Sequence, residues 1–189
     1  MSNKIKYGLK NVHYSKITVE DGEVNYDTPK PIPGGVSLTL SPTGDTTTFP
    51  ADDIPYFVQT ANTGYSGELE IALIPDDFLT DIMGAVEDEN GALLEYSNAI
   101  TSEFAFAFEI QGDERARRTW FYRCSCARPN LETATKGTGI EPKTDKLVLT
   151  VMPRIKDNLS KGTLEKSEEN TAKFNSFFSS VYEPVIAEG

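Results

Sequence analysis

Apolar and polar residues alternate with a period of two along much of this sequence, and this alternation restricts the fold more than any other feature. The clearest segments are VSLTLS (36–41), GELEIAL (67–73), FAFAFEI (104–110) and KLVLTVMP (146–153). Successive side chains of a β-strand point to opposite faces, so each segment is predicted to be a half-buried strand. Turn residues separate them, as at Asn90-Gly91 and Gly112-Asp113. The pattern predicts a mainly β protein.

The alternation also assigns side chains to faces. The expected core residues of the two segments at 36–41 and 67–73 are Val36, Leu38, Leu40, Leu69, Ile71 and Leu73. The opposite, polar faces carry Ser37, Thr39, Ser41, Glu68 and Glu70. A face of hydroxyls and carboxylates suits contact with water.

One short flanking helix is predicted over PDDFLTDIMG (75–84). Asp76 is a candidate N-cap, and Gly84 is a candidate terminator. The apolar residues Phe78, Leu79, Ile82 and Met83 then share one side, suited to covering a sheet. A weaker helix is predicted within 170–184, after a polar linker at 157–169. The chain is therefore divided into a β-domain at 1–156 and a C-terminal arm at 157–189.

Residues 41–64 form an unusually long connection between two strands. We expect a projecting hairpin in which TTTF (46–49) pairs with YFVQT (56–60). It carries the apolar residues Phe49, Ile54, Tyr56, Phe57 and Val58. Exposed apolar side chains of this kind predict a partner surface.

The only two cysteines, Cys124 and Cys126, lie in FYRCSCARPN (121–130). On a regular strand they would share a face with Tyr122. A structural zinc site needs four Cys or His ligands, and the only histidine, His13, is far away in sequence. We therefore interpret the cysteines as packing residues and His13 as a surface or strand residue. No catalytic constellation, cofactor or metal is predicted, and we do not expect an enzyme.

The balance of 18 basic and 29 acidic residues gives a net charge of −11. This charge argues against tight binding of nucleic acid, which requires cations to neutralise phosphates, but it allows nucleic acid to pass. The one basic stretch, RARRTWFYR (115–123), is expected to form a hairpin with 104–112 and to pair with acidic neighbours or with the next subunit. No apolar run approaches the about 18 residues of a membrane span, and no secretory signal is expected at the start. The thiols are expected to stay reduced in the cytoplasm.

Several phrases occur in an order that resembles a known family. They are IKYGLKNVHYSKIT (5–18), GYSGELEIALIPDDFLTDIMG (64–84), FAFAFEIQGDERARRTWFYRCSCARPN (104–130) and RPNLETATKGTGIEPKTDKLVLTVMPR (128–154). Together they resemble the major tail protein, or tail tube protein, of phages with long non-contractile tails, a type common in phages and prophages of Gram-positive bacteria. The resemblance covers residues 1–155 and contains no catalytic motif.

The resemblance implies two packed β-sheets with a flanking helix, and hexameric rings that stack into a tube. Four strands of each subunit would line an inner barrel through which DNA passes during ejection. The implied partners are other copies of the chain, the tape measure protein and other tail proteins, with DNA only in transit and no membrane. The implied location is the virion tail, assembled in the cytoplasm of the host.

On this interpretation two groups of residues become candidate functional sites. The candidate lumen-facing residues are Ser37, Thr39, Ser41, Glu68 and Glu70, although the two glutamates could instead face solvent outside a tube. The candidate inter-subunit residues are Phe49, Ile54, Tyr56, Phe57 and Val58. Two alternatives stay open: a discrete β-sandwich that binds a receptor or carbohydrate at a phage tip, and a tube protein of a related injection system.

Overall fold

The computed structural model describes residues 7–20, 23–51, 53–113, 115–133 and 143–185. Within these residues the strands are β1 (Leu9–Glu20), β2 (Glu23–Tyr26), β3 (Lys30–Pro31), β4 (Gly35–Thr43), β5 (Thr46–Ala51), β6 (Ile54–Thr60), β7 (Gly64–Ile71), β8 (Val86–Glu87), β9 (Leu93–Leu94), β10 (Phe104–Ile110), β11 (Arg118–Cys126), β12 (Asp145–Val151) and β13 (Lys161–Leu164). The helices are α1 (Asp76–Asp81) and α2 (Thr171–Asn175). The prediction of a mainly β fold with a short flanking helix is confirmed.

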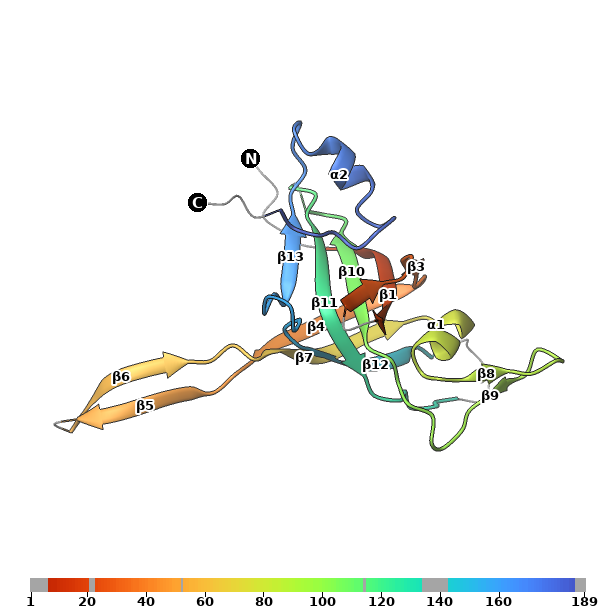
Figure 1. The fold of residues 1–189 in the computed structure, drawn as a ribbon, viewed down its shortest axis with the longest axis horizontal. Helices are drawn as coiled ribbons and strands as arrows, with labels where there is room; N and C mark the ends of the chain where they lie inside the picture. Colours follow the sequence, from red (N-terminus) through yellow and green to blue (C-terminus); the bar gives the residue numbers. More distant parts are fainter. Residues whose placement is uncertain (1–6, 21–22, 52, 114, 134–142, 186–189) are drawn as a thin grey trace, which may run out of the picture.

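Nine strands form one large antiparallel sheet in the order β2-β1-β10-β11-β12-β7-β4, with β13 added to β11 and β3 to β1 (Figure 1). The two packed β-sheets that were expected are therefore the two halves of this single sheet. Only Cys124–Cys126 of β11 pair with Leu149–Val151 of β12, and this short junction joins the half that contains β1 and β10 to the half that contains β7 and β4. Side chains of both halves meet in one apolar core, where Phe121 packs edge-on against Tyr65 with ring centroids 5.4 Å apart.

A β-bulge in β11 changes which side chains share a face. Phe104 is opposite Cys124, but Phe106 is opposite Phe121, so β11 has one more residue than β10 between these pairs. Cys124 consequently lies in the core between the two halves of the sheet, whereas Tyr122 packs on the opposite side with Trp120. The prediction that Tyr122 shares a face with the cysteines is wrong, because it assumed a regular strand.

The C-terminal segment, residues 157–185, covers the second face of β10 and β11. β13 pairs with Arg118–Phe121 of β11, and the buried side chains of Phe174 and Phe177 follow in and after α2. As a result β10 is buried on both faces, with Ala105 and Ala107 as completely covered as Phe104. The prediction of a linker over 157–169 is wrong, because backbone hydrogen bonds place part of it within the main sheet.

The helix α1 begins one residue earlier than the capping prediction supposed. Pro75 is the N-cap residue, and no side chain caps the helix, so Asp76 is its first helical residue rather than its cap. Phe78, Ile82 and Met83 are buried on the core side, as predicted. Gly84 adopts φ 74°, the left-handed conformation that ends helices.

Two residues expected in the core are exposed at strand ends. The β4–β7 register shifts between Gly35 and Ser37, and Val36 is 51% exposed at this irregularity. Leu73 lies beyond the end of β7 and is 71% exposed. The inward orientation of Leu38, Leu40, Leu69 and Ile71 is confirmed, because all four belong to or pack against the core cluster.

β5 and β6 form the predicted projecting hairpin, which extends from the body along the long axis of the molecule (Figure 1). Phe49 pairs with Phe57, and Thr46 pairs with Thr60. Hydrogen bonds from Ala61 N to Asp45 O and from Thr63 N to Thr43 O, both 2.9 Å, continue the pairing toward β4 and β7. The hairpin is therefore an extension of the β4–β7 ribbon.

Candidate functional site

The polar face of β4, β7 and β12 is the first candidate surface. Strand register places Ser37 beside Glu70, Thr39 beside Glu68 and Ser41 beside Ser66. On the other side of β7, Lys146 is beside Glu70, Val148 beside Glu68 and Thr150 beside Ser66. The structure therefore brings together all five residues predicted to form one polar surface, and it adds a third strand to them.

The charges of this polar face are partly neutralised. Lys146 Nζ lies 3.0 Å from Glu68 Oε1. Glu70 accepts hydrogen bonds from Thr144 Oγ1 at 2.6 Å and from Ser37 Oγ at 3.1 Å. These two bonds, that from Thr144 first, hold the pKa of Glu70 below its usual value. Glu70 thus stays ionised, but the face carries one lysine for two glutamates.

Sequence reasoning missed the contribution of β12. Lys146, Val148 and Thr150 alternate with the buried residues of that strand, so the period of two did indicate that they share an outward face. What it did not indicate is that β12 lies beside β7, because the two strands are about 80 residues apart in sequence. The pairing is known only from the tertiary structure.

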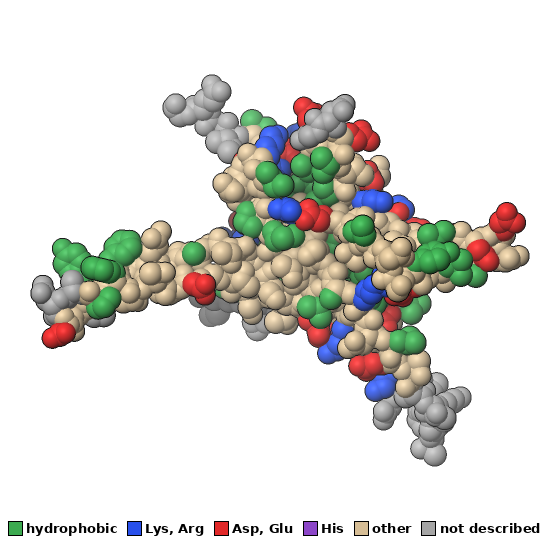
Figure 2. All heavy atoms as spheres, turned by 60° about the horizontal axis from the view of Figure 1, so that its bottom comes forward, with side chains coloured by type: hydrophobic (Ala, Val, Ile, Leu, Met, Phe, Trp, Pro, Cys, Tyr) green, Lys and Arg blue, Asp and Glu red, His purple; other side chains and the backbone are tan. Residues whose placement is uncertain are grey.

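The apolar end of the projecting hairpin is the second candidate surface. Its five apolar side chains, Phe49, Ile54, Tyr56, Phe57 and Val58, are between 54% and 73% exposed. Figure 2 shows hydrophobic side chains gathered near the end of this hairpin, far from the body. Neither face of the hairpin is covered by another part of the described chain. Such clustered exposure is typical of a protein–protein contact.

An apolar groove of about 460 Å³ lies near the base of the projecting hairpin. It separates β4 and β7 from the facing ends of β1, β10 and β11, and its lining residues are Tyr7, Gly8, Leu9, Leu38, Leu40, Tyr65, Phe108, Ile110, Phe121 and Lys161. Phe108 and Phe121 stack with ring centroids 6.2 Å apart. The Lys161 ammonium lies 5.1 Å from the Tyr65 ring centroid. No feature of the sequence predicted this groove.

The cysteines and the histidine are packing residues, as predicted. Cys124 and Cys126 are buried free thiols, and burial raises the pKa of Cys126 to about 12 and that of Cys124 further. Thiols with such pKa values are poor nucleophiles at neutral pH. The His13 ring stacks on Phe178 at 4.8 Å. In the part of the chain that the structure describes, no group of three or more His, Cys, Asp or Glu side chains is placed to hold a metal.

The basic stretch of β11 pairs with acidic neighbours within the same chain, as predicted. Arg118 Nε lies 2.9 Å from Glu109, and Arg123 forms two hydrogen bonds of 2.7 Å to Glu103. Arg117 pairs with Asp113 at 2.5 Å. The two arginines of β11, Arg118 and Arg123, are therefore engaged in ion pairs within the chain.

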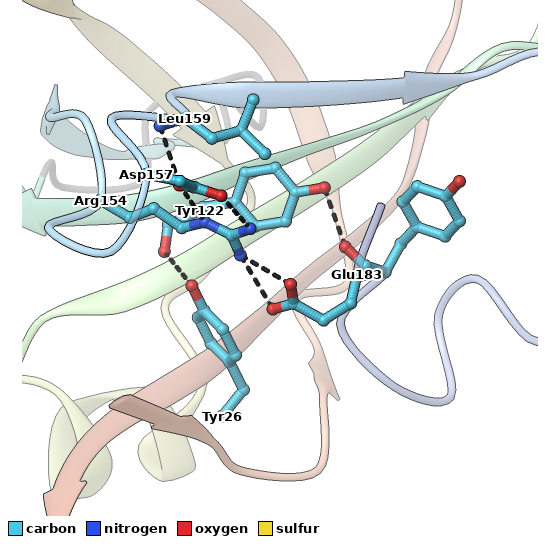
Figure 3. Close-up of polar contacts among 7 residues, drawn as sticks. Tyr26, Tyr122, Arg154, Asp157, Leu159 and Glu183 are labelled. Atoms are coloured by element: carbon cyan, nitrogen blue, oxygen red, sulfur yellow. Dashed lines mark hydrogen bonds and ion pairs between the residues drawn. The ribbon is translucent and has the colours of Figure 1, made fainter. Parts of the chain in front are cut away.

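A buried arginine holds the C-terminal segment against the sheet (Figure 3). Arg154 forms two hydrogen bonds of 2.7 Å to Asp157 and two of 2.8 and 2.9 Å to Glu183. Its guanidinium lies 4.6 Å from the Tyr122 ring centroid, and Tyr122 Oη donates to Tyr182 O at 2.8 Å. Hydrogen bonding to Asp157 raises the pKa of Arg154 and lowers that of Asp157. The arrangement fixes residues near the end of the segment to the outer face of β11.

Comparison with known proteins assigns no family to the chain. No family model matches the chain, and no curated protein matches it. No helix among the described residues has the length and hydrophobicity needed to cross a membrane.

Proposed function

We propose that this chain is a structural protein of a phage tail, and that it polymerises as stacked, hexameric rings into the tail tube through which DNA is ejected. The observation that carries the proposal is the projecting hairpin, which holds five exposed apolar side chains at a distance from the body. We expect these exposed apolar side chains to be buried against other subunits. The resemblance of four ordered sequence phrases to tail tube proteins indicates that this assembly is a tube of stacked rings.

The polar face of β4, β7 and β12 is the proposed lining of the tube. A conduit for DNA works best when its wall neither binds phosphate nor offers apolar surface. With six subunits, two glutamates and one lysine each would place twelve carboxylates and six ammonium groups in one ring. The resulting excess of six negative charges repels DNA over distances near the screening length of about 8 Å at physiological salt.

The same proposal assigns partners and location. Copies of the chain are the principal partners, and the tape measure protein and other tail proteins are the further partners. DNA is a passing cargo, and the protein resides in the virion tail after assembly in the host cytoplasm. The engaged arginines of β11 support the view that DNA is not held.

Electron microscopy of the concentrated, purified protein tests the proposal. We expect rings or tubes with a continuous central channel, and we expect the double variant Phe49→Ser, Phe57→Ser to remain monomeric while keeping its circular dichroism spectrum. Both phenylalanines are more than half exposed, so their replacement should leave the fold intact. A wild-type protein that stays monomeric at every concentration would contradict the tube and favour a discrete binding module.

A further inference from the structure

The projecting hairpin cannot cover its apolar end against its own body. Leu40 in the apolar groove and Phe49 on the hairpin are nine residues apart on one continuous ribbon, which is about 30 Å at about 3.3 Å per residue. Hydrogen bonds across residues 43–63 leave no break in the ribbon that would let it fold back. Any surface that covers Phe49 and Phe57 must therefore belong to another molecule.

The apolar groove offers the matching chemistry. Its walls are aromatic and aliphatic, with Phe108 and Phe121 from β10 and β11, and Tyr65, Leu38 and Leu40 from β7 and β4. Its volume of about 460 Å³ lies in the range of about 300–1,000 Å³ of pockets that bind ligands. It can therefore accept part of the apolar end of a hairpin.

Charge distinguishes this groove from the other exposed apolar area. Residues 41–64 contain three aspartates and no lysine or arginine. Lys161 lies at the groove, and no carboxylate of the described residues is within ion-pair distance of it. The second apolar area, on the β8–β9 hairpin at the opposite end of the long axis, carries Glu87, Asp88 and Glu89 (Figure 1). An acidic hairpin is attracted by the first surface and repelled by the second.

We propose that the apolar groove of one copy binds the apolar end of the projecting hairpin of a second copy, with Lys161 facing the acidic hairpin. The inference rests on the proposed self-assembly and names the surface that receives the hairpin. Each copy then uses two different surfaces: the apolar end of its projecting hairpin binds one neighbour, and its apolar groove binds the hairpin of another. A contact of this heterologous type closes into a ring or continues as a filament, and it leaves every interior hairpin covered.

Photo-crosslinking tests the contact in the full chain. Phe57 is replaced by the photoreactive residue benzoylphenylalanine, which keeps an aromatic side chain, and the concentrated protein is irradiated. We expect crosslinked dimers, and peptide mapping should place the second end of the crosslink on Leu38–Leu40, Phe108 or Phe121. Crosslinks that map to residues 86–100 or to another surface would overturn the groove while leaving self-assembly in place.

A peptide experiment separates the groove from the tube. A fluorescent cyclised peptide of residues 46–60 is titrated with the full chain, and binding is followed by anisotropy. We expect saturable binding that Lys161→Glu weakens by about 3- to 10-fold, since charge reversal replaces attraction with repulsion. The matched control Lys173→Glu, at another exposed lysine, should bind as the wild type does.

The outcomes are distinct. If the chain binds the peptide with this pattern but never assembles, the proposed binding of the hairpin in the groove stands and the proposed tube is refuted. The groove is refuted by an absence of binding, or by equal affinities for the two lysine variants.

Discussion

Replacing Arg154 by methionine should detach the C-terminal segment from the sheet. The arginine side chain is 7% exposed, whereas its partners Asp157 and Glu183 are 33% and 50% exposed. Removing one member of a fully buried ion pair costs about 3–5 kcal/mol. Because both carboxylates can regain water here, and because methionine keeps much of the packing on Tyr122, we expect a loss of about 2–3 kcal/mol in the free energy of unfolding.

The single tryptophan reports on the same segment. Trp120 is fully buried, and its Nε1 donates to Phe177 O at 2.9 Å. Urea denaturation followed by Trp120 fluorescence should show a midpoint lowered by about 1–1.5 M, for a slope near 2 kcal/mol/M. We also expect the fluorescence of the variant to change at lower urea than its far-ultraviolet circular dichroism, because the segment covers Trp120 while most of the sheet lies elsewhere.

Arg115→Met is the matched control. Arg115 is 67% exposed and lies 3.7 Å from Glu165, so its removal should change the free energy of unfolding by less than about 0.5 kcal/mol. Equal losses in the two variants, or an Arg154→Met protein whose two transitions coincide near the wild-type midpoint, would refute the view that Arg154 holds the segment.

The difference between wild type and Arg154→Met should also depend on pH. The arginine lowers the folded-state pKa of Asp157 below the unfolded value of about 3.9. A group with a depressed folded pKa contributes stability above its unfolded pKa and loses it as the pH falls through the folded pKa. We therefore expect a constant difference between pH 7 and about pH 5, shrinking below about pH 4. A difference that grows in acid would contradict this assignment.

Three further predictions follow from the described contacts. Changing Cys124 and Cys126 together to alanine should lower the free energy of unfolding by about 1–3 kcal/mol, and elemental analysis of the wild type should find no stoichiometric zinc; one metal per chain would overturn the packing role. Deleting residues 46–58 should leave a folded monomer by circular dichroism and light scattering, and polymerisation of this variant would exclude the hairpin as an assembly element. Replacing Glu68 and Glu70 by lysine should leave tails assembled but slow DNA ejection most at low salt, since the lumen would then attract phosphate; unchanged ejection would place both residues outside the channel.

Local features of the fold could be predicted from the sequence because they depend on neighbouring residues. The period of two identified the strands and the inward orientation of Leu69 and Ile71. The threonine and aromatic runs at 46–60 identified a hairpin between the two segments that pair in the structure, and the apolar residues within it indicated an exposed apolar surface. Each of these features requires only that side chains alternate along a strand and that a turn joins two strands.

The bulge in β11 shows where such local reasoning fails. The sequence FYRCSC contains nothing that distinguishes a bulged strand from a regular one, so Tyr122 was predicted on the face of Cys124. Both faces of β11 are covered, one by the core and one by the C-terminal segment, so Cys124 and Tyr122 are both buried although they lie on opposite faces. A strand with two apolar environments can turn an aromatic side chain to either of them.

The sequence by itself determined that this chain forms β-strands, bears an apolar hairpin and presents hydroxyls and carboxylates on one side of two strands. The tertiary structure decided which distant segments complete those surfaces. Lys146 reaches Glu68 only because β12 pairs with β7, and Lys161 reaches the groove only because β13 pairs with β11. The physical reason is that alternation along a strand is set by backbone geometry within a few residues, whereas strand order and the covering of a second face come from packing between residues far apart in the chain.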